Sequence, residues 1–208
     1  MPIAWHDPST RERLKALVRE VEAQSAAELV LTVRPSSGDD RAADLLFAAV
    51  LAFAGLCVYV YAPWEFTDDL TPPSILALFL GGYVFSSRVP AVRRLFSRRA
   101  QREARVRAAA RAAFVDQGIA STRDRTGILI YVSLFERAAE VVVDIGVLRR
   151  ESEGQPAAAI EAIARVVREG GDLPAFEAAV RDLGAFLAGA LPPRLDDQNE
   201  LSDEVNVA

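Results

Sequence analysis

Two long apolar stretches interrupt a chain whose hydrophobic and polar positions otherwise vary over short distances. Residues 45–62 have the sequence LLFAAVLAFAGLCVYVYA, without a charged side chain. A helix rises 1.5 Å per residue, so this run crosses most of a hydrocarbon core about 30 Å thick. The second stretch, 74–87, has the sequence SILALFLGGYVFSS. Taken over 70–92 it is also long enough to cross, with Arg88 reaching back to the interface. We expect a transmembrane helical hairpin over 43–92, with a shallow re-entrant second segment as the alternative.

The remaining sequence predicts alternating helices and strands. Apolar residues at helical spacing follow a capping residue, Asp7 or Ser9, and a β-branched run follows over 28–33. Beyond the hairpin we expect one long helix over 93–117 ended by Gly118, strands over 126–133 and 139–144, helices over 156–169 and 173–190, and an acidic flexible tail over 192–208.

These elements predict one domain split by the hairpin. Neither the lone first strand nor the later strand pair makes an independent sheet. We therefore expect an α/β (α+β) fold in which residues 1–42 and 93–191 share a small mixed sheet of about three strands covered by helices. A two-span hairpin returns the chain to the side that it left, so such an insertion is geometrically sound.

Charge differs sharply between the two ends of the hairpin. The loop carries Glu65, Asp68 and Asp69 and no basic residue, whereas the flank after the second stretch is rich in arginine and is offset only by Glu103. The positive-inside rule places that flank and both termini in the cytoplasm. The arginines next to the membrane are expected to contact anionic lipid headgroups: Arg88, Arg93, Arg94, Arg98 and Arg99. Nucleic-acid binding is not expected, because no aromatic stacking platform accompanies them.

Cysteine content excludes several kinds of site. The one cysteine, Cys57, lies inside the first apolar stretch, so no disulfide framework and no cysteine-rich metal site are expected. The N-terminus lacks a basic segment followed by an apolar core, so we expect the internal stretches to direct insertion and no cleavable signal peptide.

Several segments resemble the TPM domain family. Residues 25–33, SAAELVLTV, are similar to its first strand, and residues 123–133, RDRTGILIYVS, followed by 141–147, VVVDIGV, match it more closely. Residues 199–203, NELSD, resemble a bacterial membrane branch in which a transmembrane hairpin interrupts the domain. The resemblance covers residues 10–203. It implies an α/β domain in a multi-pass protein of the bacterial inner membrane, and acid phosphatase activity and divalent-metal binding have been attributed to some members. Many members place the domain outside the cytoplasm, unlike the orientation expected here.

Asp144 is the residue that we single out for chemistry. It ends a predicted strand, precedes a glycine turn and matches the acidic position of the family motif. A carboxylate there suits calcium or magnesium, which need several oxygen ligands. Glu28 and Glu140 are companions only if the fold brings them near. The alternative is a structural role for Asp144 in an Asx turn.

The function predicted from these features is that of a membrane-anchored, non-enzymatic module that binds a protein partner, with a divalent metal as a candidate ligand. The alternative is a metal-dependent acid phosphatase-like hydrolase. Hydrolysis needs a metal-bound water, a nucleophile or a histidine. Cys57 is expected inside the membrane, and the single histidine, His6, is expected on the surface.

Overall fold

The chain forms two compact units in a computed structural model that describes residues 3–38, 41–63, 68–149, 156–193 and 205–207. Residues 1–37 and 103–208 make up the first unit, the sheet domain. Residues 38–102 make up the second, the hairpin unit. The inserted unit is thus wider than the predicted 43–92, because the segment after the second apolar helix packs on the first apolar helix.

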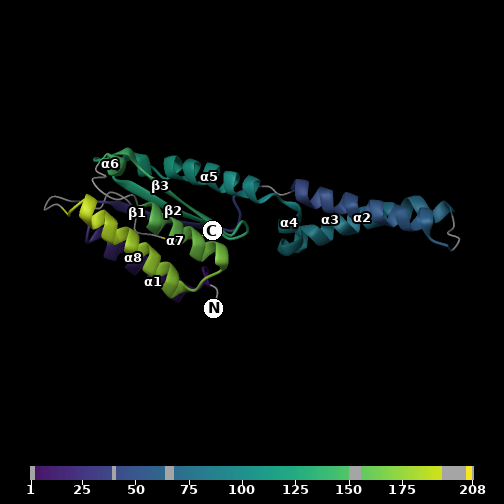
Figure 1. Cartoon of the computed structure of the whole chain (residues 1–208), viewed down its shortest axis with the longest axis horizontal. Coiled ribbons are helices and arrows are strands. Elements are labelled where there is room, and N and C mark those ends of the chain that lie inside the picture. The colour runs from purple at the N-terminus through teal and green to yellow at the C-terminus, as the bar shows by residue number, and fades with distance from the viewer. Residues whose placement is uncertain (1–2, 39–40, 64–67, 150–155, 194–204, 208) are drawn as a thin grey trace. The chain divides into compact units, whose positions relative to one another are not determined.

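The sheet domain is built on four strands in the order β3-β2-β1-β4 (Figure 1). They are β1 Glu28–Arg34, β2 Gly127–Ser133, β3 Ala138–Val143 and β4 Asn206–Val207. β1 runs parallel to β2 and to β4, whereas β2 and β3 are antiparallel. The predicted α/β fold is confirmed, with one strand more than expected. β4 corrects the prediction that the tail is flexible throughout, because residues 206–207 pair with β1; residues 194–204 of that tail lie outside the described residues.

Helices cover the two faces of the sheet unequally (Figure 1). On one face lie α1 Pro8–Glu22, α7 Ala157–Glu169 and α8 Leu173–Ala190, over a core that contains Leu31 and Ile130. On the other face lies α5 Arg99–Asp116, which belongs to the sheet domain from Glu103 onward and packs over Val30 and Leu129. Alternate strand residues point to opposite faces, so β1, β2 and β3 each contribute apolar residues to both cores. Two short elements, the 3-10 turn Ile119–Ser121 and α6 Ile145–Leu148, flank β2 and β3.

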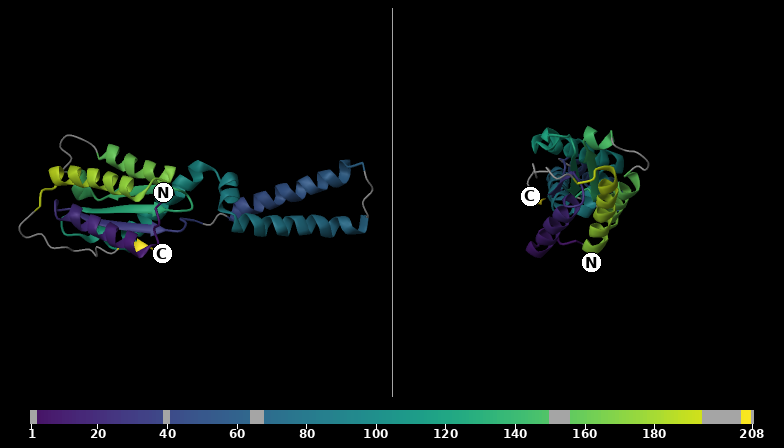
Figure 2. Two further views of the ribbon diagram at one scale, coloured as in Figure 1. Left: turned by 90° about the horizontal axis from the view of Figure 1, so that it is seen from below. Right: turned by 90° about the vertical axis from the view of Figure 1, so that its left-hand side faces the viewer.

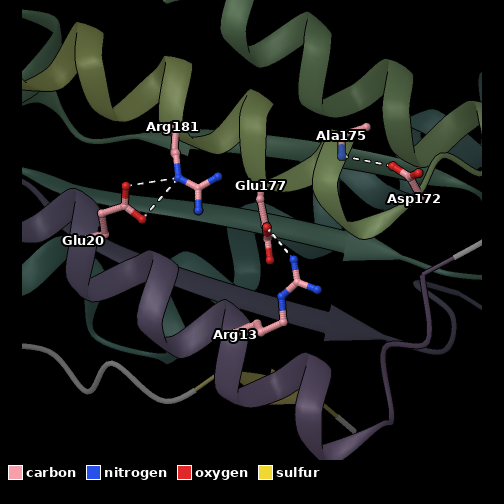
Figure 3. Close-up of polar contacts among 6 residues, drawn as sticks. All are labelled: Arg13, Glu20, Asp172, Ala175, Glu177 and Arg181. Atoms are coloured by element: carbon pink, nitrogen blue, oxygen red, sulfur yellow. Dashed lines mark hydrogen bonds and ion pairs between the residues drawn. The ribbon is translucent and has the colours of Figure 1, made fainter.

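Two ion pairs join α1 to α8 (Figure 3). Arg13 Nη2 lies 2.8 Å from Oε2 of the buried Glu177, and Arg181 Nε lies 3.0 Å from Oε1 of Glu20. At the start of α8, Asp172 caps the helix, since the Ala175 amide donates to Asp172 Oδ1 over 3.1 Å. The Arg181–Glu20 pair is exposed and so contributes little to the free energy of folding. The Arg13–Glu177 pair matters more, because without Arg13 the buried Glu177 carboxylate would lose its ion-pair partner.

The hairpin unit contains α2 Arg41–Tyr61, a 3-10 turn Asp68–Leu70, α3 Thr71–Arg88 and α4 Pro90–Phe96. α2 and α3 lie side by side (Figure 2). Gly82 permits this approach, because a Cβ there would lie 3.2 Å from the Cα of Ala48. A Cβ on the neighbouring Gly81 would meet no atom within 4 Å. By length and composition α2 is able to cross a membrane, whereas α3 qualifies only together with α4, from which it is bent by 106°.

Two sequence predictions fail after Arg88. The second apolar helix does not continue to Val92, because Pro90 favours an extended residue before it and Val89 has φ −114° and ψ 94°. The predicted helix over 93–117 is two helices, α4 and α5, separated by an extended Ser97 with φ −103° and ψ 131°. Arg102 stabilises this break, since its Nη1 donates to the carbonyl oxygens of Arg94 and Ser97 over 2.8 and 2.6 Å.

Candidate functional site

Asp144 lies at the end of β3, where it caps α6. Its side chain is 5% exposed, and Oδ1 accepts a 2.7 Å hydrogen bond from the Ile145 amide. Arg125 Nε lies 2.9 Å from Oδ2. The Asp144 amide donates to the Gly127 carbonyl, and the Gly146 amide donates to the Arg125 carbonyl. These contacts support the structural role that was the alternative to metal ligation.

The two carboxylates named as companions of Asp144 are differently placed. Glu28 pairs in register with Gly127, which lies between β1 and the end of β3, so it is at the same end of the sheet with one strand intervening. Two strand spacings amount to about 10 Å between backbones. Glu140 pairs with Tyr131, farther along β3. Among the described residues no three His, Cys, Asp or Glu side chains form a group that could hold a metal ion. Metal binding by Asp144 stays a prediction.

A buried polar network that the sequence did not indicate lies at the other end of the sheet. Glu136, in the β2–β3 turn, is 6% exposed. Its Oε1 accepts from the Ser37 amide over 2.9 Å, and its Oε2 accepts from the Ser133 hydroxyl. The Ser37 hydroxyl donates in turn to Ser133 Oγ over 2.7 Å and lies 3.3 Å from the Tyr131 hydroxyl. This network fixes the last residue of the sheet domain before the chain enters the hairpin unit.

A second polar chain crosses from β1 to β4 on the α5 side of the sheet. The buried Thr32 hydroxyl exchanges hydrogen bonds of 3.1–3.2 Å with the side-chain amide of Gln117, which follows α5. Gln117 Oε1 also accepts from Asn206 Nδ2 over 3.2 Å. Three residues far apart in the sequence thus form one contact. A polar residue inside a β-branched run, as at Thr32, was the only available sign of it.

The hairpin unit contains a buried acidic residue near the start of its first helix, α2. Asp44, in the first turn of α2, is 1% exposed. Its Oδ1 accepts from Ser86 Oγ over 2.7 Å and from Arg93 Nε over 3.0 Å, and its Oδ2 lies 2.7 Å from Arg93 Nη2. One carboxylate therefore joins α2, α3 and α4.

The arginines predicted to contact lipid headgroups do not share one environment. Arg88, Arg98 and Arg99 are exposed, and Arg94 is half-buried in α4. Arg93 is different, because its guanidinium is bound to Asp44 on two sides. Its positive charge is therefore balanced locally, and the headgroup prediction rests mainly on the other four.

His6 and Cys57 form no hydrogen bond with Asp44, Glu136 or Asp144 among the described residues. His6 is exposed just before α1, and Cys57 is a half-buried free thiol within α2. Among the described residues, the carboxylates of Asp44, Glu136 and Asp144 are thus bonded to serine, arginine and backbone groups and not to His6 or Cys57.

Comparisons with known proteins give a fold and no family. No protein-family model matches the chain, and no curated protein matches it either. One solved structure is similar: the NMR structure of BA42 protein from the psychrophilic bacterium Bizionia argentinensis, with a TM-score of 0.58 and 13% sequence identity. The match covers 97% of this chain and 94% of that one. At this identity the likeness concerns the fold alone, so the TPM resemblance stays a prediction.

Proposed function

We propose that this protein is a membrane-anchored, non-enzymatic interaction module in which the hairpin unit is the anchor and the sheet domain binds a protein partner. The observation that carries the anchor is the apolar outer surface of α2 and α3. Phe53 is 66% exposed, and large apolar side chains recur on both helices, among them Val58, Val60, Leu76, Leu80 and Val84. In water such a surface is unfavourable by about 25 cal/mol per Å², whereas lipid removes that cost.

The polar groups of the hairpin unit support the same placement. Asp44, Ser86 and Arg93 satisfy one another, which a charged group near hydrocarbon requires. The bend of 106° turns α4 away from the direction of α3, as expected of a short helix in the headgroup layer. There Leu95, which is 80% exposed, would enter the acyl boundary, and Arg88, Arg94, Arg98 and Arg99 would meet lipid phosphates.

Orientation in the proposal follows from charge. The arginine flank is assigned to the cytoplasmic side of a bacterial inner membrane, and the loop with Glu65, Asp68 and Asp69 to the outer side. Reporter fusions in the 65–70 loop and at the C-terminus test it. The expected result is opposite sides; both reporters on one side would mean that the second apolar segment is re-entrant.

The interaction role is tested by crosslinking in native membranes followed by mass spectrometry. We expect one protein to be enriched with the wild-type chain and to be lost when the sheet domain is denatured before crosslinking. Recovery of no specific protein would refute this part of the proposal while leaving the anchor untouched. A hydrolase is not proposed, because no arrangement among the described residues favours it.

A further inference from the structure

The edge of the sheet at β1 is occupied by the chain's own last residues. β4 is two residues long, and it pairs in parallel with β1 at Thr32–Asn206 and Val33–Val207. Toward the start of β1 the Leu29 amide donates to the Glu22 carboxylate over 2.9 Å. Sheet edges with open backbone groups accept further strands. The β4 segment therefore adds a strand to this edge at Thr32 and Val33, whereas the Leu29 amide is already bonded to the Glu22 carboxylate.

Side chains on both faces of the β4 segment contact the rest of the sheet domain. Val205 is buried in the core that contains Leu31 and Val33, and Val207 packs against the same core. Asn206 points to the opposite face, where its Nδ2 donates to Gln117 Oε1 over 3.2 Å. The buried Thr32 hydroxyl holds Gln117 in place. The sheet domain thus contacts the side chains of this apolar, amide, apolar segment as well as its backbone.

The shortness of β4 favours exchange over permanent pairing. A strand of two residues is shorter than the usual five or six, so it contributes few ladder hydrogen bonds. The stretch before it, 192–204, carries five acidic residues: Asp196, Asp197, Glu200, Asp203 and Glu204. A tethered segment competes through its high effective concentration, which an external strand overcomes when it makes more contacts.

We propose that the β1 edge, with Gln117 beside it, is a peptide-binding site for an extended segment of a protein partner, and that Val205–Asn206–Val207 occupies it until the partner arrives. The partner segment has branched apolar residues on either side of an Asn or Gln. This inference rests on the proposed interaction function and assigns its docking surface.

The probe is a fluorescent synthetic peptide with the sequence of residues 199–208, NELSDEVNVA. Its binding is measured by anisotropy to the full chain and to a chain ending at Glu204, both in the same detergent. We expect the shortened chain to bind the peptide at least about tenfold more tightly, because its own segment no longer competes. Equal binding to both chains, or no binding to a shortened chain that retains its helical circular dichroism, would overturn the proposal.

Two further measurements keep the test decisive. Gln117→Ala in the shortened chain should weaken the peptide about fivefold, as one lost hydrogen bond does. The same variant should leave unchanged a peptide with Ala in place of Asn206; equal loss for both peptides would refute the Gln117 contact. If the shortened chain fails to fold, the full-length variant Asn206→Ala replaces it, with tighter peptide binding than wild type expected and no gain counting against the proposal.

Two other outcomes separate this inference from its alternatives. Sedimentation of the full chain should give one chain per micelle; an oligomer that dissociates on removal of 205–208 would mean that the segment comes from a second copy, which overturns self-occupation. Failure of peptide binding together with specific crosslinking in membranes would retain the interaction function and place its surface elsewhere.

Discussion

Asp44 and Arg93 form a two-point ion pair that closes the hairpin unit. The pair distances are 3.0 Å between Arg93 Nε and Asp44 Oδ1 and 2.7 Å between Arg93 Nη2 and Asp44 Oδ2. Because Ser86 donates to the same carboxylate, three helices depend on one side chain. A planar guanidinium on both carboxylate oxygens also fixes orientation, so the pair sets where α4 lies against α2. The otherwise apolar hairpin unit thus has one buried polar cluster, Asp44, Ser86 and Arg93, that joins its helices.

Removing one partner of this pair should destabilise the hairpin unit. Asp44→Ala removes the carboxylate to which Arg93 is bound, and breaking a buried ion pair costs about 3–5 kcal/mol. The readout is alkylation of the single cysteine, Cys57 in α2, during heating in detergent. We expect faster labelling and a lower midpoint than wild type. Asp44→Leu with Arg93→Leu should recover part of the loss, and Arg98→Ala, at an exposed arginine, serves as the control. An unchanged midpoint in Asp44→Ala would show that the pair is not holding the helices.

The Glu136 network predicts a local effect where the chain leaves the sheet domain. Glu136→Ala removes the acceptor for the Ser37 amide and for two hydroxyls, those of Ser36 and Ser133. Hydrogen bonds to a charged group contribute about 1.5–3 kcal/mol. Hydrogen exchange at the Ser37 amide should accelerate, with little change in β2. Glu140→Ala, at a half-buried position on β3, is the matched control and should leave that amide protected.

Substitution by alanine at Gly146 and at Gly189 should change the stability of the sheet domain in opposite directions. A Cβ on Gly146 would lie 2.2 Å from the Asp124 carbonyl oxygen and 2.4 Å from that of Arg125. Gly146→Ala should therefore destabilise the sheet domain by about 1–3 kcal/mol or more, as overpacking does. A Cβ on Gly189, in α8, meets no atom within 4 Å. Gly189→Ala should be neutral or stabilising by about 0.5–1 kcal/mol. Chemical denaturation of both variants checks the pair, and similar losses in both would contradict the close approach at Gly146.

Asp7 predicts a pH-dependent contribution to stability. The Ser9 hydroxyl, and next the Thr10 amide, donate to its carboxylate and lower the pKa of Asp7 below its ordinary value of 3.8. A lowered pKa means that the folded state favours the ionised form, so this contribution is present above pH 3.8 and is lost as the pH falls through the lowered pKa. The difference in melting temperature between wild type and Asp7→Ala should be largest near neutral pH and shrink in acid. A difference that grows in acid would reverse the assigned sign.

The sequence by itself determined the elements whose signals are local. The uncharged run over 45–62 predicts α2 because length and polarity alone decide it, and the β-branched runs predict β1, β2 and β3 in nearly their observed bounds. Asp7 caps its helix as expected, since a cap needs only the next three residues. A split domain followed from counting strands, because isolated strands are unstable.

The tertiary structure decided the features that depend on partners distant in the chain. Asp44 borders an apolar stretch and gives no sign in the sequence that Ser86 and Arg93 bury it. Glu136 looks like an ordinary turn residue until β1 brings Ser37 to it. β4 is too short for any local pattern, and it forms because the edge of β1 and Gln117 accept it. In each case the free energy comes from satisfying a buried polar group or an open strand edge, and neither exists until the chain has folded.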